Sequence, residues 1–219
     1  MLFQRRSRPV IGLDITTSSI KLIELSRSGD GYRVESYAAE PSPPNAINEK
    51  AIVDAQAVGE AVRRAVKRAG ARAKEVAVAI SGDAAITKVI QMPRNLREAE
   101  LESQVEMQAD QYIPFPMEEV SFDFEVIGPS EKDPEMLDVL LVATRSENVE
   151  QRQSSVQAAG LAARIVDVEA FALENACRLL THQMPDGGMD RNIAVIDFGA
   201  SSTTFSVLRD LKVTYTRDF

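Results

Sequence analysis

Cysteine, histidine and tryptophan are almost missing from this chain of 219 residues, which has one Cys, one His and no Trp. A single Cys excludes a disulfide framework within the chain, and with only one His no Cys/His zinc site can be built. A Ser-His-Asp triad would have to use His182, and nothing around that residue points to one. No run approaches the roughly 20 apolar residues that a membrane-spanning helix needs.

Basic side chains are also fewer than acidic ones. The chain has 33 acidic and 25 basic side chains, a formal net charge of -8, which argues against broad nucleic-acid binding. Arg5, Arg6 and Arg8 lie near the start, but the apolar stretch after them stops at Asp14, too short for a signal peptide. Together with the lone Cys177, this predicts a protein of the reducing cytoplasm.

What is present is a pattern of strands and helices. Strands are predicted over residues 10–15, 20–25, 32–37 and 76–80, bounded by turn signals. Asp54 is a good N-cap for a helix that Gly70 ends, with apolar residues at helical spacing between them.

A second group of elements follows. Strands are predicted over 86–92, 120–126, 137–144 and 165–168, with a helix capped by Asn95 and Glu98 and another running from Ser146 to Gly160. Their order predicts a small α+β module of its own, spanning residues 84–164. A helix over 170–180 and strands over 193–197, 205–208 and 213–215 complete the chain.

Two segments of the chain share one sequence pattern, and this internal repeat contains the residues with candidate chemistry. Residues 11–19 (IGLDITTSS) align with residues 194–202 (AVIDFGASS), and each copy is an apolar strand that ends in Asp and leads into a small, hydroxyl-rich turn. The two aspartates are 183 positions apart, which exceeds the repeat period of solenoid proteins and suggests duplication of a half-molecule.

Two such turns facing each other can clamp a polyphosphate. Backbone N–H groups of a tight Gly/Ser/Thr turn can donate hydrogen bonds to phosphate oxygens, and Lys21 can add a point charge. Asp14 and Asp197 can hold Mg²⁺, directly or through water. The alternative for each copy is a plain β-hairpin whose turn uses these residues for local reasons. The predicted phosphate site comprises Asp14, Thr16, Thr17, Ser18, Ser19, Lys21, Asp197, Gly199, Ala200, Ser201, Ser202 and Thr203.

These hairpins resemble the paired phosphate loops of the actin-like ATPase superfamily. Residues 12–15 with 18–25, 109–116, 143–149, 166–170 and 195–200 further resemble motifs of the PilM family of type IV pilus assembly proteins, which is related to the cell-division protein FtsA. The resemblance implies an α/β fold: an actin-like (ribonuclease H-like) lobe, an inserted FtsA-like subdomain and the start of a second lobe. It implies residues 1–83 and 165–190 for the first lobe, 84–164 for the inserted subdomain and 191–219 for the opening strands of the second lobe.

The family resemblance also implies ligands and partners. Members bind ATP with Mg²⁺ between two lobes and hold the N-terminal cytoplasmic tail of the inner-membrane protein PilN, alongside other components of the pilus machine. The chain is therefore expected at the inner membrane only through a partner. The family's peptide groove lies between the inserted subdomain and its parent lobe. Tyr112, Ile113 and Phe115 are candidates to line it, and the alternative is that they plug a core.

Two departures from the family pattern lead to further expectations. Thr16 stands where the family usually has Gly, so its Cβ would narrow the turn or cost strain at a positive φ. The family also continues past the second hairpin, so we expect a truncated second lobe, weak or absent ATP binding, and an exposed strand edge after Asp197 that favours self-association.

Two functions from different classes remain open. The first is a nucleotide-binding assembly adaptor, and the second is an actin-fold ATPase or a sugar-kinase-like phosphotransferase. A kinase needs a placed base and a substrate pocket, and no segment offers one beyond the phosphate loops. The sequence therefore favours the adaptor over an enzyme.

Overall fold

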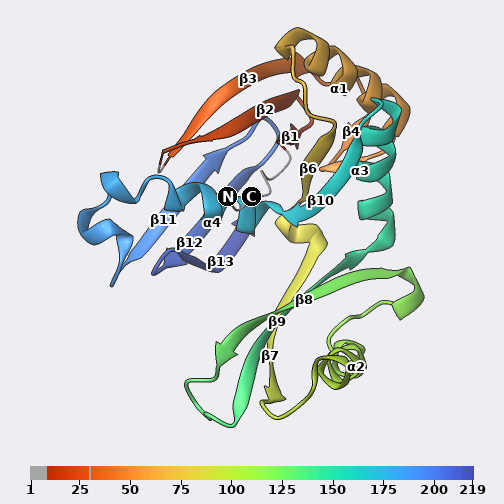
Figure 1. The fold of residues 1–219 in the computed structure, drawn as a ribbon. Helices are drawn as coiled ribbons and strands as arrows, with labels where there is room; N and C mark the ends of the chain where they lie inside the picture. The colour runs from red at the N-terminus through yellow and green to blue at the C-terminus, as the bar shows by residue number, and fades with distance from the viewer. Residues whose placement is uncertain (1–8, 30) are drawn as a thin grey trace, which may run out of the picture. The chain divides into compact units, whose positions relative to one another are not determined.

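The computed structural model describes residues 9–29 and 31–219, so the arginines at positions 5, 6 and 8 lie outside the described residues. The chain forms two compact units, which we call the first unit (Met1–Gly82 with Glu150–Phe219) and the second unit (Asp83–Val149) (Figure 1). Residues 150–164, grouped with the inserted module at the sequence level, lie in the first unit because they pack on its core and join its sheet.

The first unit is built on a mixed sheet with the strand order β10-β6-β1-β2-β3. The antiparallel part consists of β1 (Val10–Ile15), β2 (Ser19–Ser28) and β3 (Gly31–Pro41). β6 (Glu75–Ile80) runs parallel to β1, and β10 (Ala162–Val168) runs parallel to β6. A small hairpin of β4 (Ile47–Asn48) and β5 (Ala51–Ile52) lies before the first helix.

Two helices supply the apolar side chains that cover this sheet: α1 (Ala55–Ala69) and α3 (Ser146–Ala158) (Figure 1). The predicted caps of α1 are confirmed. The Asp54 carboxylate accepts the N–H of Ala57 at 2.9 Å, and Gly70 ends the helix at φ 65°, which a residue without a Cβ adopts most easily. The buried stripe predicted from helical spacing contains Val58 and Val62, both fully buried.

The rest of the first unit is a helix and a second sheet. α4 (Glu169–Arg178) is followed by 3₁₀ turns at Thr181–Gln183 and Pro185–Gly188. The antiparallel sheet has the order β11-β12-β13, with β11 (Asn192–Phe198), β12 (Thr203–Arg209) and β13 (Lys212–Asp218). The N–H of Val213 donates to the Glu174 carboxylate at 2.8 Å, which fixes β13 to α4.

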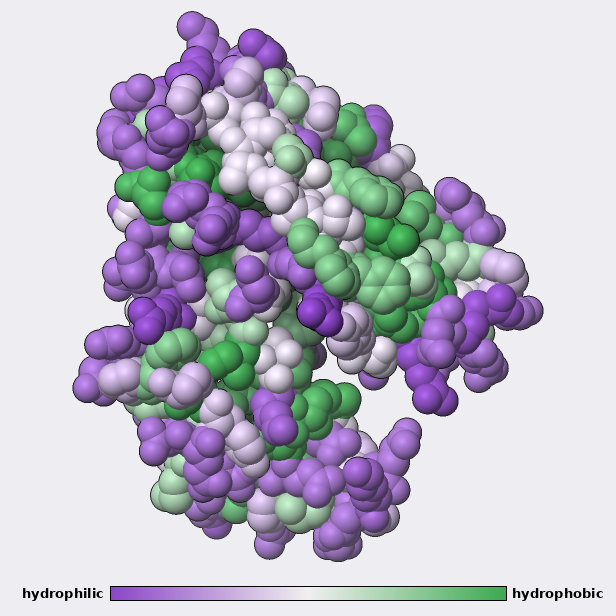
Figure 2. Space-filling model, turned by 180° about the vertical axis from the view of Figure 1, so that it is seen from behind, coloured by the Kyte–Doolittle hydropathy of each residue, from purple (hydrophilic) through white to green (hydrophobic). Residues whose placement is uncertain are grey.

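One face of the β11–β13 sheet leaves apolar side chains in solvent. Ser206 and Leu208 are buried, whereas Ile196, Phe198 and Tyr215 are exposed. Figure 2 shows apolar residues gathered on this part of the surface. The self-association expected from this region stays a prediction.

The second unit pairs one helix with a three-stranded antiparallel sheet. The strands are β7 (Ala85–Pro93), β8 (Val120–Pro129) and β9 (Met136–Arg145), in the order β7-β9-β8, and the helix is α2 (Glu98–Ala109). 3₁₀ turns occupy Gly82–Ala84 and Met117–Glu119. Leu101 and Val105 of α2 pack in one core with Met92 and Leu141 of the sheet.

The expected cap of α2 was wrong by two residues. The N-cap position is Arg97 rather than Asn95, and the Arg97 N–H donates to the Glu100 carboxylate at 2.9 Å. Glu100, rather than Glu98, therefore occupies the N3 position. Its carboxylate forms the half of a capping box that accepts the N–H of the N-cap residue. Among the helices of residues 9–29 and 31–219, none is long and apolar enough to cross a membrane.

Candidate functional site

The two repeated segments, residues 11–19 and 194–202, lie in hairpins of the same construction. In the first, β1 pairs with β2 so that Asp14 lies opposite Lys21, and in the second, β11 pairs with β12 so that Asp197 lies opposite Thr204. Each turn is closed by the same backbone bond, from Thr16 N–H to Ser19 O and from Gly199 N–H to Ser202 O, both 3.0 Å. The two segments with similar sequence therefore also have similar backbone geometry.

The first residue of each turn differs, and the structure shows why both are accommodated. A Cβ on Gly199 would lie 2.7 Å from the carbonyl oxygen of Ser202, closer than real contacts allow. Thr16 has no positive φ, so the strain that its Cβ would suffer there does not arise. Its hydroxyl donates to Ser19 O at 2.9 Å and therefore reinforces the turn.

The electrostatics centre on Lys21. Its Nζ donates to the Asp14 carboxylate at 2.9 Å, and both side chains are about half exposed. The pKa of Lys21 is raised, first by the hydrogen bond and charge of Asp14 and to a lesser degree by the charge of Asp197. The charges of both aspartates thus act on the Lys21 ammonium, which indicates that the two hairpin ends share one electrostatic environment.

A direct contact joins the two turns. The hydroxyls of Thr17 and Ser201, 184 positions apart, are hydrogen-bonded at 2.9 Å. Within the described residues, the backbone N–H groups of Thr17, Ser18, Ala200 and Ser201 form no hydrogen bond. Exposed N–H groups of successive turn residues are the donors that bind phosphate oxygens, so this arrangement fits a polyphosphate.

The fit to a magnesium ion is more limited. No group of three or more His, Cys, Asp or Glu residues that could hold a metal occurs among the described residues. Asp14 and Asp197 alone supply two carboxylates, and Asp14 is paired with Lys21. Mg²⁺ typically takes one or two carboxylates together with phosphate oxygens and waters. These residues therefore fit the ion only as part of a nucleotide complex.

A polar network in the first unit, in which Arg152 is buried and Lys50 and Asp218 are partly buried, was missed by sequence reasoning. Arg152 of α3 is 5% exposed, and its Nε and Nη2 donate to the carbonyls of Ala79 and Lys50 at 2.6 and 3.4 Å. The Lys50 ammonium pairs with the Asp218 carboxylate at 2.6 Å, and Asp218 also accepts the hydroxyl of Thr204. Lys50 and Asp218 are 168 positions apart, so no local signal could have linked them.

Glu169, the first residue of α4, belongs to the same electrostatic environment. Burial raises the pKa of its carboxyl, the charges of Lys50 and Arg152 lower it, and those of Asp14 and Asp218 raise it. Glu169 is therefore a half-buried carboxyl within electrostatic range of the Asp14 hairpin. In the sequence, Glu169 lies within residues 166–170, one of the segments that resemble the PilM family, and this resemblance is the signal that could have found it.

The expected groove residues have unequal environments in the second unit. Ile113 is 5% exposed and belongs to the core, and Phe115 packs against that core with the Arg145 guanidinium 4.4 Å from its ring. Tyr112 is 41% exposed, with Lys88 Nζ 5.3 Å from its ring centre. Only Tyr112 presents a large surface to solvent.

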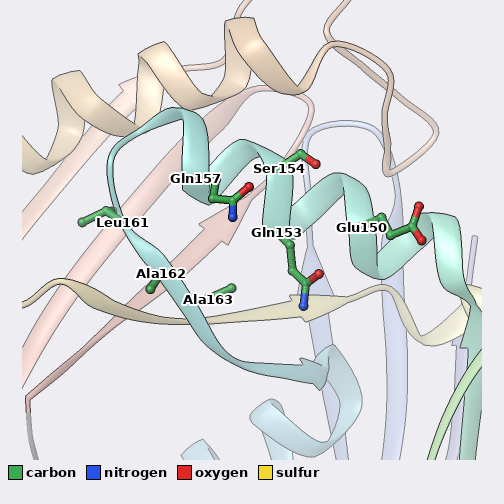
Figure 3. A pocket seen from close by; sticks show the side chains of 7 residues that line it. All are labelled: Glu150, Gln153, Ser154, Gln157, Leu161, Ala162 and Ala163. Atoms are coloured by element: carbon green, nitrogen blue, oxygen red, sulfur yellow. The ribbon is translucent and has the colours of Figure 1, made fainter.

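A shallow groove of about 500 Å³ lies elsewhere in the first unit, between α3 and β10 (Figure 3). Its α3 side carries Glu150, Gln153, Ser154 and Gln157, and its floor is formed by the small residues at the start of β10. None of the residues that line it is a predicted phosphate-site residue, so the groove has no part in the hairpin site.

Comparison with known families gives one match over almost the whole chain. Residues 12–219 match the family described as type IV pilus assembly protein PilM. This range includes the turns of both hairpins and the whole of the second unit.

Two solved structures are similar in fold. The PilM-PilN type IV pilus biogenesis complex matches at 30% identity and a TM-score of 0.78, covering 98% of this chain and 62% of that one. The cytoplasmic domain of EpsL, an inner-membrane component of the Vibrio cholerae type II secretion system, matches at 13% identity and a TM-score of 0.56, covering 96% of this chain and 71% of that one. The chain thus spans about 62% of the length of the first of these relatives. The predicted α/β class is confirmed.

Proposed function

Because this chain belongs to the PilM family of type IV pilus assembly proteins, we propose that it is an assembly adaptor that holds the N-terminal cytoplasmic tail of PilN. The observation that carries the proposal is the similarity to the chain of the PilM-PilN complex, which extends over 98% of this chain. In this role the protein lies in the cytoplasm and reaches the inner membrane through its partner.

The hairpin site adds a nucleotide to this proposal. Asp14, Lys21 and Asp197, with the N–H groups of the two turns, form the phosphate-binding part of a site for ATP with Mg²⁺. The support is the Thr17–Ser201 contact, which brings the two turns together. When bound, the metal neutralises phosphate charge, and Lys21 contributes a further positive charge.

Binding of a PilN tail tests the partner. We expect a synthetic peptide copying the cognate PilN tail to bind in isothermal titration calorimetry, and Tyr112→Ala to weaken binding about tenfold, as loss of an exposed aromatic anchor does. Tyr215→Ala is the matched control, since Tyr215 is also about half exposed but lies on β13. Absence of heat with the unaltered protein would refute the PilN proposal.

Titration with ATP and Mg²⁺ tests the nucleotide site. In ¹H–¹⁵N NMR spectra we expect the amides of Thr17, Ser18, Ala200 and Ser201 to shift, with an affinity about tenfold weaker in Lys21→Met because one phosphate-directed charge is lost. Lys212→Met, which removes an exposed ammonium from β13, should leave the titration unchanged. Shifts confined to other residues would show that the hairpins do not bind phosphate.

Hydrolysis by an actin-fold ATPase remains the second candidate function, and Glu169 is the observation that favours it. A half-buried carboxyl with a raised pKa near a phosphate site is suited to act as a general base. Phosphate release that disappears in Glu169→Gln while ATP binding is retained would favour the enzyme. Binding without phosphate release favours the adaptor.

A further inference from the structure

The second unit carries the negative charge of the whole protein. Residues 83–149 contain 15 Asp and Glu against 5 Lys and Arg, a net charge of -10, whereas the remaining residues sum to +2. Asp123 and Glu125 of β8 form no ion pair with any described residue. This unit therefore holds a strong negative potential that the protein does not neutralise at β8.

Two of these carboxylates border a sheet face that α2 does not cover. Side chains alternate along each strand, and Val139 and Leu141 of β9 point into the core that α2 shares. The opposite face, which we call the open face, carries Val89 and Thr87 of β7, Leu140 and Val142 of β9, and Asp123 and Glu125 of β8.

The open face has an apolar centre and an acidic side. The strand register places Val89 opposite Leu140 and Leu140 opposite Glu125, while Thr87 lies opposite Val142 and Val142 opposite Asp123. Val89 is 50% exposed, and Leu140 and Val142 are half-buried. Each row across the sheet therefore runs from the β7 edge through an aliphatic residue to a carboxylate.

We propose that the open face docks a basic amphipathic helix of a partner protein. A sheet with one face covered by a helix completes a layered arrangement when a second helix covers the other face. The apolar stripe of the helix contacts Val89, Leu140 and Val142, and its Lys and Arg residues pair with Asp123 and Glu125. Nucleic acids and anionic membranes carry the same sign of charge as this unit and are repelled by it.

The inference goes beyond the adaptor function and uses neither the nucleotide hairpins nor Tyr112. The PilN tail titration with Tyr112→Ala is a separate measurement, so failure of either proposal leaves the other standing. The probe for the open face is a fluorescein-labelled leucine–lysine peptide about five helical turns long, with its leucines on one side. A scrambled peptide of the same composition, without an apolar stripe, is the reference.

Fluorescence anisotropy on the full chain gives the test. We expect the amphipathic peptide to bind, Asp123→Lys with Glu125→Lys to weaken it about tenfold, and Val89→Thr to weaken it a few-fold. The matched control is Glu102→Lys with Glu106→Lys, the same charge change at exposed positions on α2, which should weaken binding less than about threefold. Circular dichroism checks that each variant is folded.

Several results would overturn the proposal. Equal weakening by the β8 and α2 variants, or equal affinity for the scrambled peptide, would show diffuse attraction to an acidic surface rather than docking on the open face. No binding of the amphipathic peptide at low salt would show that the face does not accept such a helix. If the β8 charge variants weakened binding but Val89→Thr did not change the affinity, the peptide would not contact the apolar centre of the open face, and the proposed docking would be wrong in that part.

Discussion

Replacement of Arg152 by methionine is expected to lower the free energy of unfolding by about 3 kcal/mol. The guanidinium is 5% exposed, and it donates to the carbonyl oxygens of Ala79 and Lys50. Methionine fills much of the same volume, so the loss reports on the two carbonyls left without these donors, at about 1–3 kcal/mol each, rather than on a cavity. Urea denaturation measures the change.

The control for this variant is Arg164→Met. Arg164 pairs with Glu75 at 2.6 Å, but its side chain is 50% exposed, and exposed pairs contribute about 0–1 kcal/mol. If the two variants lost the same stability, burial of the Arg152 hydrogen bonds would not be the source of their contribution.

The stability loss expected for Arg152→Met depends on pH, and the sign of this dependence follows from Glu169. Burial raises the pKa of Glu169 above its ordinary value, and the charge of Arg152 counteracts the shift. A raised carboxyl pKa favours the folded state at low pH, and that contribution is lost as pH rises through the folded-state pKa. Without Arg152 the ionised carboxylate loses a neighbouring cation, so the deficit should be larger at pH 8 than at pH 5. Adding Glu169→Gln should reduce this difference.

Replacement of Gly59 by alanine is expected to destabilise the protein by about 2 kcal/mol, although alanine is the better helix former by about 1 kcal/mol. Gly59 lies in α1 where the helix meets α3, and an added Cβ would clash with the Ala158 methyl and lie 2.7 Å from the carbonyl oxygen of Ser155. The contact involves backbone, so a rotamer change cannot relieve it and the two helices must separate.

Gly70→Ala provides the comparison, measured by the same denaturation experiment. Gly70 has open space around it but a φ of 65°, so alanine there should cost only about 1 kcal/mol, from backbone strain. A stabilising effect of Gly59→Ala would mean that α1 and α3 do not pack as closely as the structure places them.

The sequence predicted most of the elements because their signals are local. Asp54 and Gly70 mark the ends of α1, and the alternation of apolar with polar residues marks β8. It failed at the start of α2, where Asn95 and Glu98 have the spacing of a capping box but Arg97 and Glu100 form the bond. Two overlapping candidate caps of similar strength cannot be separated without the packing that fixes where the helix begins.

By itself the sequence determined the two hairpins, their turn chemistry and the equivalence of Asp14 with Asp197, since each depends on neighbouring residues along one strand pair. Only the tertiary structure decided that Thr17 meets Ser201, and that Arg152, Lys50 and Asp218 form one polar network. It also decided that residues 150–164 belong to the first unit. Such contacts join residues far apart in the chain, and they form only where packing of the cores brings those segments together.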